Sequence, residues 1–334
     1  LLIQKITGYV SYVSGENPFT FPYRIWPSVA KNPHSLKKLQ GDGWRYPSKQ
    51  INGLEITKEM EIKYLDLVMV RLSEEQNQAY NYIIRRAKEK YPILNEKRYG
   101  IQYTVIDGPL QALNIVYPHE DLEKEGEEGK IESFLYGKSG LNRIMSYSKD
   151  KKKGFEYVEK IKNKFGRIFS SEGGANSPLK KYSSKIYSII SNIKANNEGI
   201  ILIYSNYIDG GCVPVALALE EIGVTRYGGK HKSLFKTPPT KPFKIQKHSA
   251  KYIMITGDKQ LSPNNKEELK AATDPRNITG EKVKVIIISK AGSEGLDFRN
   301  IRQVHALEPW FNLNRLDQII GRAVRNKSHC QLPY

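Results

Sequence analysis

Residues 283–298 have the sequence VKVIIISKAGSEGLDF, and residues 313–325 have the sequence LNRLDQIIGRAVR. In the first stretch, the apolar and β-branched run Val283–Ile288 has the length and composition of a buried strand. A loop of small residues follows it directly, and glycine there lets a backbone approach a phosphate or a sugar closely. Together the two stretches predict a strand, a Gly-containing loop and an arginine-bearing helix.

The same alternation of strand and helix patterns extends back to Pro178. Strands are expected over 199–204, 251–255, 283–288 and near 304–306, and helices over 180–194, 211–222, 263–273 and 313–324. Strands that alternate with helices of this length predict an α/β fold, in which a parallel sheet carries helices on both faces. Ligands bind such sheets at the carboxyl ends of the strands. Residues 178–334 are therefore predicted to form one ligand-binding domain.

The chain before Pro178 lacks this alternation, and residues 36–170 are predicted to be an α+β accessory or inserted region. An aromatic, Gly- and Pro-rich connecting segment over 1–35 precedes it. Ser73 and Gln76 predict a capping box at the start of a helix that runs to about Lys90. The apolar residues expected on one face of this helix are Tyr80, Ile83, Ile84 and Ala87.

Charge is the first indication of a partner. The chain of 334 residues has a formal net charge of +18 and a pI of about 9.5, which favours a polyanion such as nucleic acid. The alternative is a lysine-rich composition inherited from an AT-rich genome. The basic run Lys149–Arg167 predicts a helix, and a solvated face is favoured over a nucleic-acid stripe. No stretch approaches the roughly 18 apolar residues of a membrane span, so no membrane partner is expected.

The spacing of Gln318, Arg322 and Arg325 places these three side chains on one helical face. Two neighbouring arginines repel each other unless a multiply charged anion lies opposite, and the planar guanidinium suits phosphate oxygens. Gly321 permits a close backbone approach. The alternative is a surface helix with scattered arginines, which the adjoining loop disfavours.

The loop 289–298 supplies the second half of this pattern. The Ser289 and Ser293 hydroxyls can bond phosphates, Gly295 permits a close approach, and Asp297 can accept a hydrogen bond from a sugar hydroxyl. A strand followed by such a loop is weak evidence alone. Followed by Gln318-x-x-Gly321-Arg322-x-x-Arg325, it indicates a nucleotide site.

Residues 178–332 resemble the second RecA-like domain of superfamily-2 helicases. Tyr204-Ser205 is similar to motif IV, Ser289–Phe298 to motif V and Gln318–Arg325 to motif VI. The stretches GYVSYVSGENPFTFPYRIWP (8–27), SGLNRIM (139–145), DGGCVPVALALEEIG (209–223) and EGLDFRNIRQVHALEPWFNLNRLDQIIGRAVRN (294–326) resemble a narrower group. This group is the helicase-like ATPases of large nucleocytoplasmic DNA viruses, related to the poxvirus early transcription factor small subunit and nucleoside triphosphate phosphohydrolase I. The composition suits a giant virus.

The resemblance implies a role for each matched residue. Arg325 would be the arginine finger on the ATP γ-phosphate with Arg322 beside it, and Gln318 would link the ATP state to the nucleic-acid site. Gly295, Asp297 and Gly321 would approach the nucleotide. The residues implied to contact the nucleic-acid backbone are Ser205, Thr256, Gly257, Ser289 and Ser293.

A motor of this class also needs a P-loop lysine and a carboxylate that holds Mg²⁺. The stretch Glu132–Ser139 approaches the P-loop pattern, but its first position is Glu132 and no apolar strand leads into it. We expect the first RecA-like domain, with both groups, to lie before Leu1. ATP and Mg²⁺ would then bind between the two domains, and this chain alone would be inactive.

The predicted function is the C-terminal half of an ATP-dependent helicase or translocase in viral transcription or genome handling. The expected partners are DNA or RNA, the first RecA-like domain, and viral RNA polymerase or transcription factors. The expected location is the virion and the viral factory in the host cytoplasm. The alternative is a non-catalytic scaffold that binds nucleic acid or polymerase, which the intact Arg322 and Arg325 disfavour.

Overall fold

The computed structural model describes residues 70–90, 103–120, 128–148, 154–195, 198–228, 233–237, 244–245, 248–290, 296–308, 313–323 and 328–332. Its helices and strands all belong to one unit, formed by residues 71–324 with 328–334. The predicted connecting segment 1–35 lies outside the described residues. Among the described residues, no helix has the length and apolar character needed to cross a bilayer.

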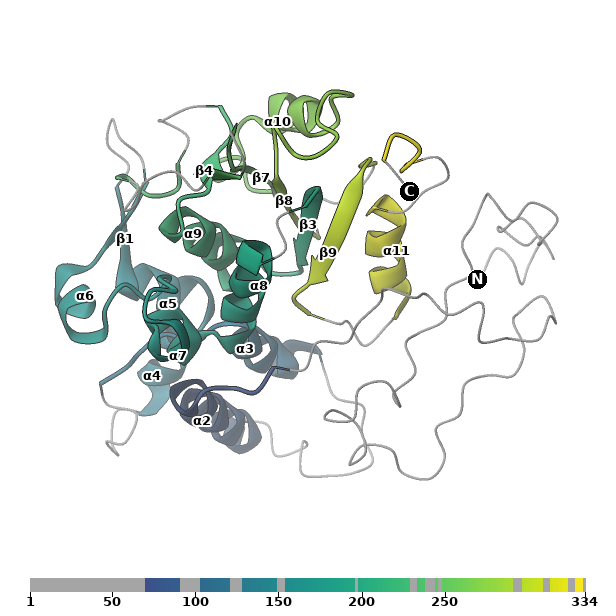
Figure 1. Cartoon of the computed structure of the whole chain (residues 1–334). Helices are drawn as coiled ribbons and strands as arrows, with labels where there is room; N and C mark the ends of the chain where they lie inside the picture. The colour runs from purple at the N-terminus through teal and green to yellow at the C-terminus, as the bar shows by residue number, and fades with distance from the viewer. Residues whose placement is uncertain are drawn as a thin grey trace, which may run out of the picture. The chain divides into compact units, whose positions relative to one another are not determined.

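Five strands form the central sheet, and each is parallel to its neighbours. Their spatial order is β4 (Thr225–Arg226), β7 (Lys251–Ile255), β8 (Val285–Ser289), β3 (Ile200–Ser205) and β9 (Ile301–Ala306) (Figure 1). The predicted RecA-like parallel sheet is therefore confirmed. Only β4 was not predicted, because two residues are too few to show a strand period.

Both faces of the sheet are buried, which explains why its strands are continuous apolar runs. On β3, Ile201 and Ile203 belong to one hydrophobic cluster, whereas Ile200, Leu202 and Tyr204 belong to another. The first cluster includes residues of α8 (Ser184–Ala195) and α9 (Val213–Glu221). The second includes residues of α10 (Asn265–Ala272) and α11 (Leu313–Ala323). Two helices thus cover each face.

The N-terminal elements extend the first cluster. They are α2 (Glu74–Lys90), α3 (Tyr103–Asn114), α4 (Glu128–Phe134), α5 (Gly137–Ile144), β1 (Met145–Ser148), β2 (Gly154–Tyr157), α6 (Glu159–Phe165), η4 (Gly174–Asn176) and α7 (Pro178–Tyr182). Their buried residues, among them Ile83, Ile115 and Leu141, share one apolar core with the sheet. The described part of the predicted accessory region therefore packs against α8 and the turn Ile208–Cys212, on the face of the sheet that α8 and α9 cover. The domain boundaries themselves stay a prediction.

The helix predicted from Ser73 is present as α2, but its capping box is not. The Gln76 N–H donates to Ser73 Oγ at 3.0 Å, as expected of an N-cap. The Gln76 side chain instead donates to Ala112 O at 3.0 Å and accepts from Ser184 N at 3.1 Å. Gln76 is buried, so its amide serves the packing of three helices. The buried apolar residues of α2 are Ala79, Tyr82, Ile83 and Ala87, whereas Tyr80 and Ile84 are only half-buried.

The helix predicted over 149–167 is wrong at residues 154–158 and present at 159–165. Residues 154–157 form β2, which pairs antiparallel with β1, and within the described residues 154–167 the helix is limited to Glu159–Phe165. Phe155 is buried, its ring lies 5.0 Å from that of Tyr147, and its N–H donates to Leu234 O. Aromatic packing across the hairpin overrides the helical pattern of the lysines.

Two other predicted helices are divided. The one over 180–194 breaks at Ser183, whose Oγ accepts from Ile186 N at 3.1 Å and so caps α8. The one over 211–222 begins as a π-helical turn, η5 (Ile208–Cys212), before α9. Such turns are frequent at functional sites. Two short strands, β5 (Lys244–Ile245) and β6 (His248–Ser249), form a separate pair.

Candidate functional site

Three predicted contact residues lie in a row at the carboxyl edge of the sheet. Ser205 and Ser289 are register partners at the ends of β3 and β8, and Thr256 directly follows β7, the next strand. The parallel sheet therefore brings together residues that are far apart in sequence. This is the edge at which sheets of this kind bind ligands.

The hydroxyls in this row are buried. Ser205 is 1% exposed, and its Oγ donates to Glu308 Oε1 at 2.7 Å and accepts from Tyr207 N at 3.1 Å. Thr256 is 2% exposed, and its Oγ1 lies 2.9 Å from Ser262 Oγ. Ser289 is buried as well. These side chains hold the loops in place, and a direct contact of their hydroxyls with a nucleic acid stays a prediction.

Gly257 is exposed and borders a groove of about 360 Å³. The groove lies between the end of β7, α10 and the segment after β8. Its lining residues are Ile255, Thr256, Gly257, Lys259, Ser262, Asn265, Lys266, Leu269 and Leu296. Lys259 and Lys266 are exposed, so two ammonium groups and a glycine backbone border the same hollow.

The helix α11 contacts the segment after β8. Arg322 Nη1 donates to Leu296 O at 3.0 Å, and Phe298 N donates to Arg322 O at 3.1 Å. Phe298 is buried in the cluster that also holds Ile319 and Ala323 of α11. The helix is therefore fixed against residues 296–298 by both packing and hydrogen bonds.

Four of the residues predicted for the nucleotide site lie in the described part of the chain. Gln318 and Asp297 are exposed, and Arg322 and Gly321 are half-buried. Gln318 and Arg322 lie one turn apart on α11, which confirms their predicted spacing on one helical face. Ser293, Gly295 and Arg325 lie outside the described residues.

A buried carboxylate, Glu308, was missed by the sequence analysis. It follows β9 and is 5% exposed. Its Oε1 accepts from Ser205 Oγ and Asn114 Nδ2, and its Oε2 accepts from Asn206 N at 2.8 Å. The available signal was its place just after β9, since Thr256 likewise lies just after β7 and Ser205 and Ser289 end β3 and β8.

Lys185 of α8 completes this cluster. Its Nζ donates to Asn114 Oδ1 and to Leu307 O, both at 2.8 Å. Burial lowers the pKa of Lys185 to about 8, and the charge of Glu308 opposes that shift. Burial raises the pKa of Glu308, while its hydrogen bonds and the charge of Lys185 oppose the rise.

The P-loop-like stretch Glu132–Ser139 spans the end of α4 and the start of α5. A helix leads into Gly137, whereas a strand leads into a P-loop. Nearby, burial raises the pKa of Asp209 at the turn after β3, and the charge of Lys138 opposes this rise.

His305 and His329 both have protein partners, and His305 Nε2 lies 3.3 Å from Gln303 Oε1. His329 Nε2 lies 2.8 Å from Ile301 O, and its Nδ1 lies 2.7 Å from Ser328 Oγ. Burial lowers the pKa of His305 to about 4. In the described part of the chain, no group of three or more His, Cys, Asp or Glu is placed to hold a metal.

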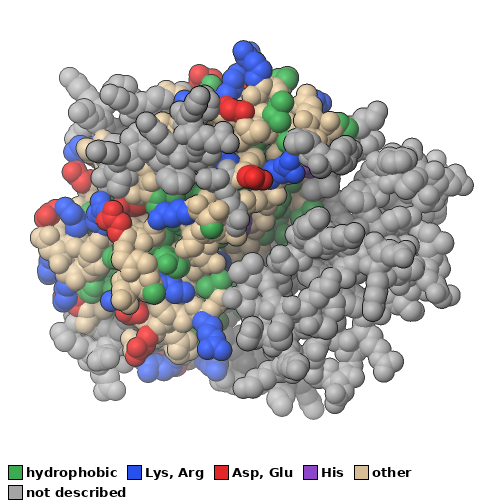
Figure 2. All heavy atoms as spheres, in the orientation of Figure 1, with side chains coloured by type: hydrophobic (Ala, Val, Ile, Leu, Met, Phe, Trp, Pro, Cys, Tyr) green, Lys and Arg blue, Asp and Glu red, His purple; other side chains and the backbone are tan. Residues whose placement is uncertain are grey.

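Lysine and arginine side chains are interspersed with acidic ones on the visible face of the described residues (Figure 2). The positive net charge is therefore not gathered into one patch on that face. The local geometry at the carboxyl edge carries more information about a ligand than the total charge does.

Comparison with known proteins agrees with this geometry. Residues 184–327 match the helicase conserved C-terminal domain. A termination factor NPH-I homolog of African swine fever virus is 33% identical over 171 residues, which cover 45% of this chain and 24% of that protein. A protein of Acanthamoeba polyphaga mimivirus named as an ATP-dependent RNA helicase is 31% identical over 330 residues, 98% of this chain and 41% of that protein.

A protein of Invertebrate iridescent virus 3 named as a helicase is 31% identical over 157 residues, 46% of this chain and 15% of that protein. The chain thus spans less than half the length of each of these relatives. The matched region contains the parallel sheet, the row of strand ends and α11. Residues 184–327 therefore form a helicase conserved C-terminal domain of the kind found in helicases of large DNA viruses.

Proposed function

We propose that this chain supplies the second motor half of an ATP-dependent superfamily-2 helicase or translocase in viral transcription or genome handling. The observation that carries the proposal is the hydrogen bond between Arg322 and Leu296 O. It joins the arginine-bearing helix to the loop that ends in exposed Asp297. In this proposal, the helix and the loop are the two halves of a nucleotide-facing wall.

ATP with Mg²⁺ would lie against this wall, and the opposite wall would come from a first RecA-like domain. The Arg322 guanidinium uses one N–H on Leu296 O, and a guanidinium has five such donors. Asp297 would accept from the ribose, and Gln318 would face the phosphates from the same side of α11 as Arg322. Bound Mg²⁺ would neutralise phosphate charge during transfer.

DNA or RNA would lie along the carboxyl edge, with its phosphates at the groove beside Gly257. Lys259 and Lys266 border this groove, and contacts of this kind need no base recognition. Since Thr256 and Ser205 are buried, we assign the direct contacts to the Gly257 backbone and the two lysines. Viral RNA polymerase or transcription factors remain the proposed protein partners, and the virion and viral factory the proposed location.

The test is Arg325→Ala in the full-length protein. Loss of an arginine finger should lower nucleic-acid-stimulated ATP turnover by about 10³-fold or more. Binding of a single-stranded oligonucleotide should persist and weaken with salt. Arg302→Ala is the matched control, because Arg302 is exposed on β9 and has no assigned role. Unchanged turnover in Arg325→Ala would favour the non-catalytic scaffold.

A further inference from the structure

Glu308 cannot act on a ligand directly, because its carboxylate is buried and holds protein groups. It accepts from side chains of Ser205 and Asn114 and from the backbone of Asn206. These donors come from the end of α3, the end of β3 and the turn after β3. The carboxylate therefore fixes the position of that turn relative to the end of β9.

Asn206 extends this link to α11. Its N–H donates to Glu308 Oε2 at 2.8 Å, while its Oδ1 accepts from Arg315 Nη1 at 3.2 Å. Arg315 and Arg322 are seven residues apart on α11, so they lie about two turns apart on the same face. Arg322 binds Leu296 O. One face of α11 is thus attached at two points, to the turn after β3 and to the loop after β8.

A carboxylate suits this position better than an amide. Both oxygens of Glu308 accept hydrogen bonds, and one of them accepts two. A glutamine would place an N–H₂ group against at least one of these donors. The nearby ammonium of Lys185, bonded to Asn114 Oδ1, supplies positive charge that favours the ionised form.

We propose that Glu308 is a positioning residue, which acts through Asn206 and Arg315 to set the arginine-bearing helix against the turn after β3. This inference rests on the proposed function. That turn lies at the edge where the nucleic acid is proposed to bind, and α11 carries the proposed catalytic arginines. The link would therefore transmit the presence of nucleic acid to ATP turnover.

The test compares Glu308→Gln, Arg315→Ala and Arg315→Lys with Arg302→Ala in the full-length protein. We would measure basal and oligonucleotide-stimulated ATP turnover, KM for ATP, and oligonucleotide Kd. Glu308→Gln and Arg315→Ala should lower the stimulated kcat by about 10-fold, which is typical of a coupling between sites. Basal kcat, KM and Kd should change less than about twofold. Arg315→Lys should retain stimulation, because one ammonium N–H can reach an amide oxygen.

Three results would overturn the inference. Variants with wild-type stimulation would show that the link has no role in coupling. Equal losses of basal and stimulated turnover with a lowered unfolding temperature, unrepaired in Arg315→Lys, would show a structural role alone. A wild-type protein without stimulated turnover would remove the proposed function as well. Arg315→Ala keeps the test decisive if Glu308→Gln fails to fold, since Arg315 is only half-buried.

Discussion

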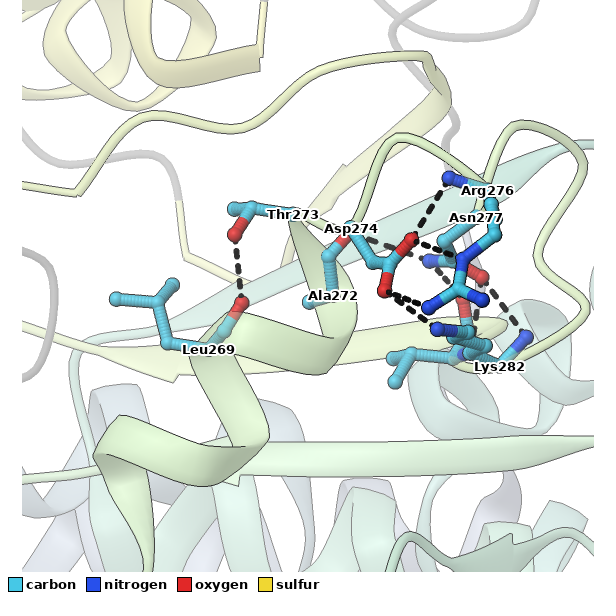
Figure 3. A network of polar contacts seen from close by, with 8 residues as sticks. Leu269, Ala272, Thr273, Asp274, Arg276, Asn277 and Lys282 are labelled. Carbon is cyan, nitrogen blue, oxygen red and sulfur yellow. Dashed lines mark hydrogen bonds and ion pairs between the residues drawn. The ribbon is translucent and has the colours of Figure 1, made fainter.

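Two polar networks lie at opposite edges of the same sheet and are built differently. At the carboxyl edge, Glu308 joins residues as far apart in sequence as Asn114 and Asn206. At the amino edge, the loop that leads into β8 is held by Asp274 and Asn277, whose partners all lie between 272 and 283 (Figure 3). The first network depends on the whole fold, and the second on one loop.

The Asn277 side chain makes four hydrogen bonds to the backbone of its own loop. Its Nδ2 donates to Ala272 O and Val283 O, and its Oδ1 accepts from Lys282 N and Val283 N. Such a loop can keep its shape without help from distant segments. The hydrogen-bond donors to Glu308 come from other elements of the fold. Removal of its carboxylate should therefore destabilise several elements at once.

Removal of the Glu308 carboxylate should have the largest effect. Glu308→Ala leaves the Asn114 amide, the Ser205 hydroxyl and the Asn206 N–H without their buried acceptor, at a cost of about 3–5 kcal/mol. Urea unfolding at neutral pH measures this loss. Glu159→Ala is the control, because the Glu159 side chain is 73% exposed, and it should change stability by less than about 0.5 kcal/mol. A loss of similar size in both variants would contradict the assigned role.

Asn277→Ala should rank second, with a loss of about 2–4 kcal/mol in the free energy of unfolding, because it leaves buried backbone groups of one loop without hydrogen-bond partners. Asn277→Asp keeps the acceptor for Lys282 N and Val283 N but cannot donate, so it should recover part of that loss. Urea unfolding compares the two variants. The local network predicts that hydrogen-exchange protection falls mainly near 272–283, and a loss spread over the sheet would contradict it.

Gly211→Ala should come third and tests the close packing at the carboxyl edge. A Cβ on Gly211 would lie 1.9 Å from Ser205 Oγ and 3.5 Å from Glu308 Oε1. The resulting displacement should cost about 1–3 kcal/mol in urea unfolding. Ser205→Ala removes the nearest atom, so the double variant should be more stable than the sum of the single losses implies. Strict additivity would show that the two residues do not meet.

These predictions also separate what the sequence could and could not reveal. The strand β7 was predicted at its observed bounds, and β3, β8 and α11 within two residues, because each is a strongly patterned local run. The order of motifs V and VI indicated a nucleotide site, whereas the contact of Arg322 with Leu296 O is a finding of the structure. The Glu308 network could not be predicted, because the sequence around Asn114 and Lys185 does not indicate that their side chains bond to residues 307–308.

The wrong predictions have the same origin. Gln76 was assigned to a local capping box, but a buried amide gains more from Ala112 and Ser184 on two other helices. Residues 154–157 were assigned to a basic helix, but Phe155 packs into the core opposite Tyr147. In each case, contacts between distant segments outweigh a local pattern.

Asp274→Asn should have the smallest effect on stability, and it tests how the stability of the amino-edge loop depends on pH. Hydrogen bonds from Arg276 and Lys282 lower the pKa of Asp274 below its usual value of 3.8. A carboxylate with a lowered folded-state pKa adds stability above its unfolded pKa and loses it as pH falls. The gap in unfolding temperature between wild type and Asp274→Asn should thus shrink below about pH 4 and at high salt.

Burial raises the pKa of Glu308, so the pH dependence of stability from this group has the opposite sign. Between the pKa values of the unfolded and folded states, the folded state retains a proton that the unfolded state releases. The stability that this group contributes therefore falls as pH rises through that range. Equal pH slopes in Asp274→Asn and Glu308→Gln would mean that both carboxylates are held in the same way, which their positions at the two edges of the sheet contradict.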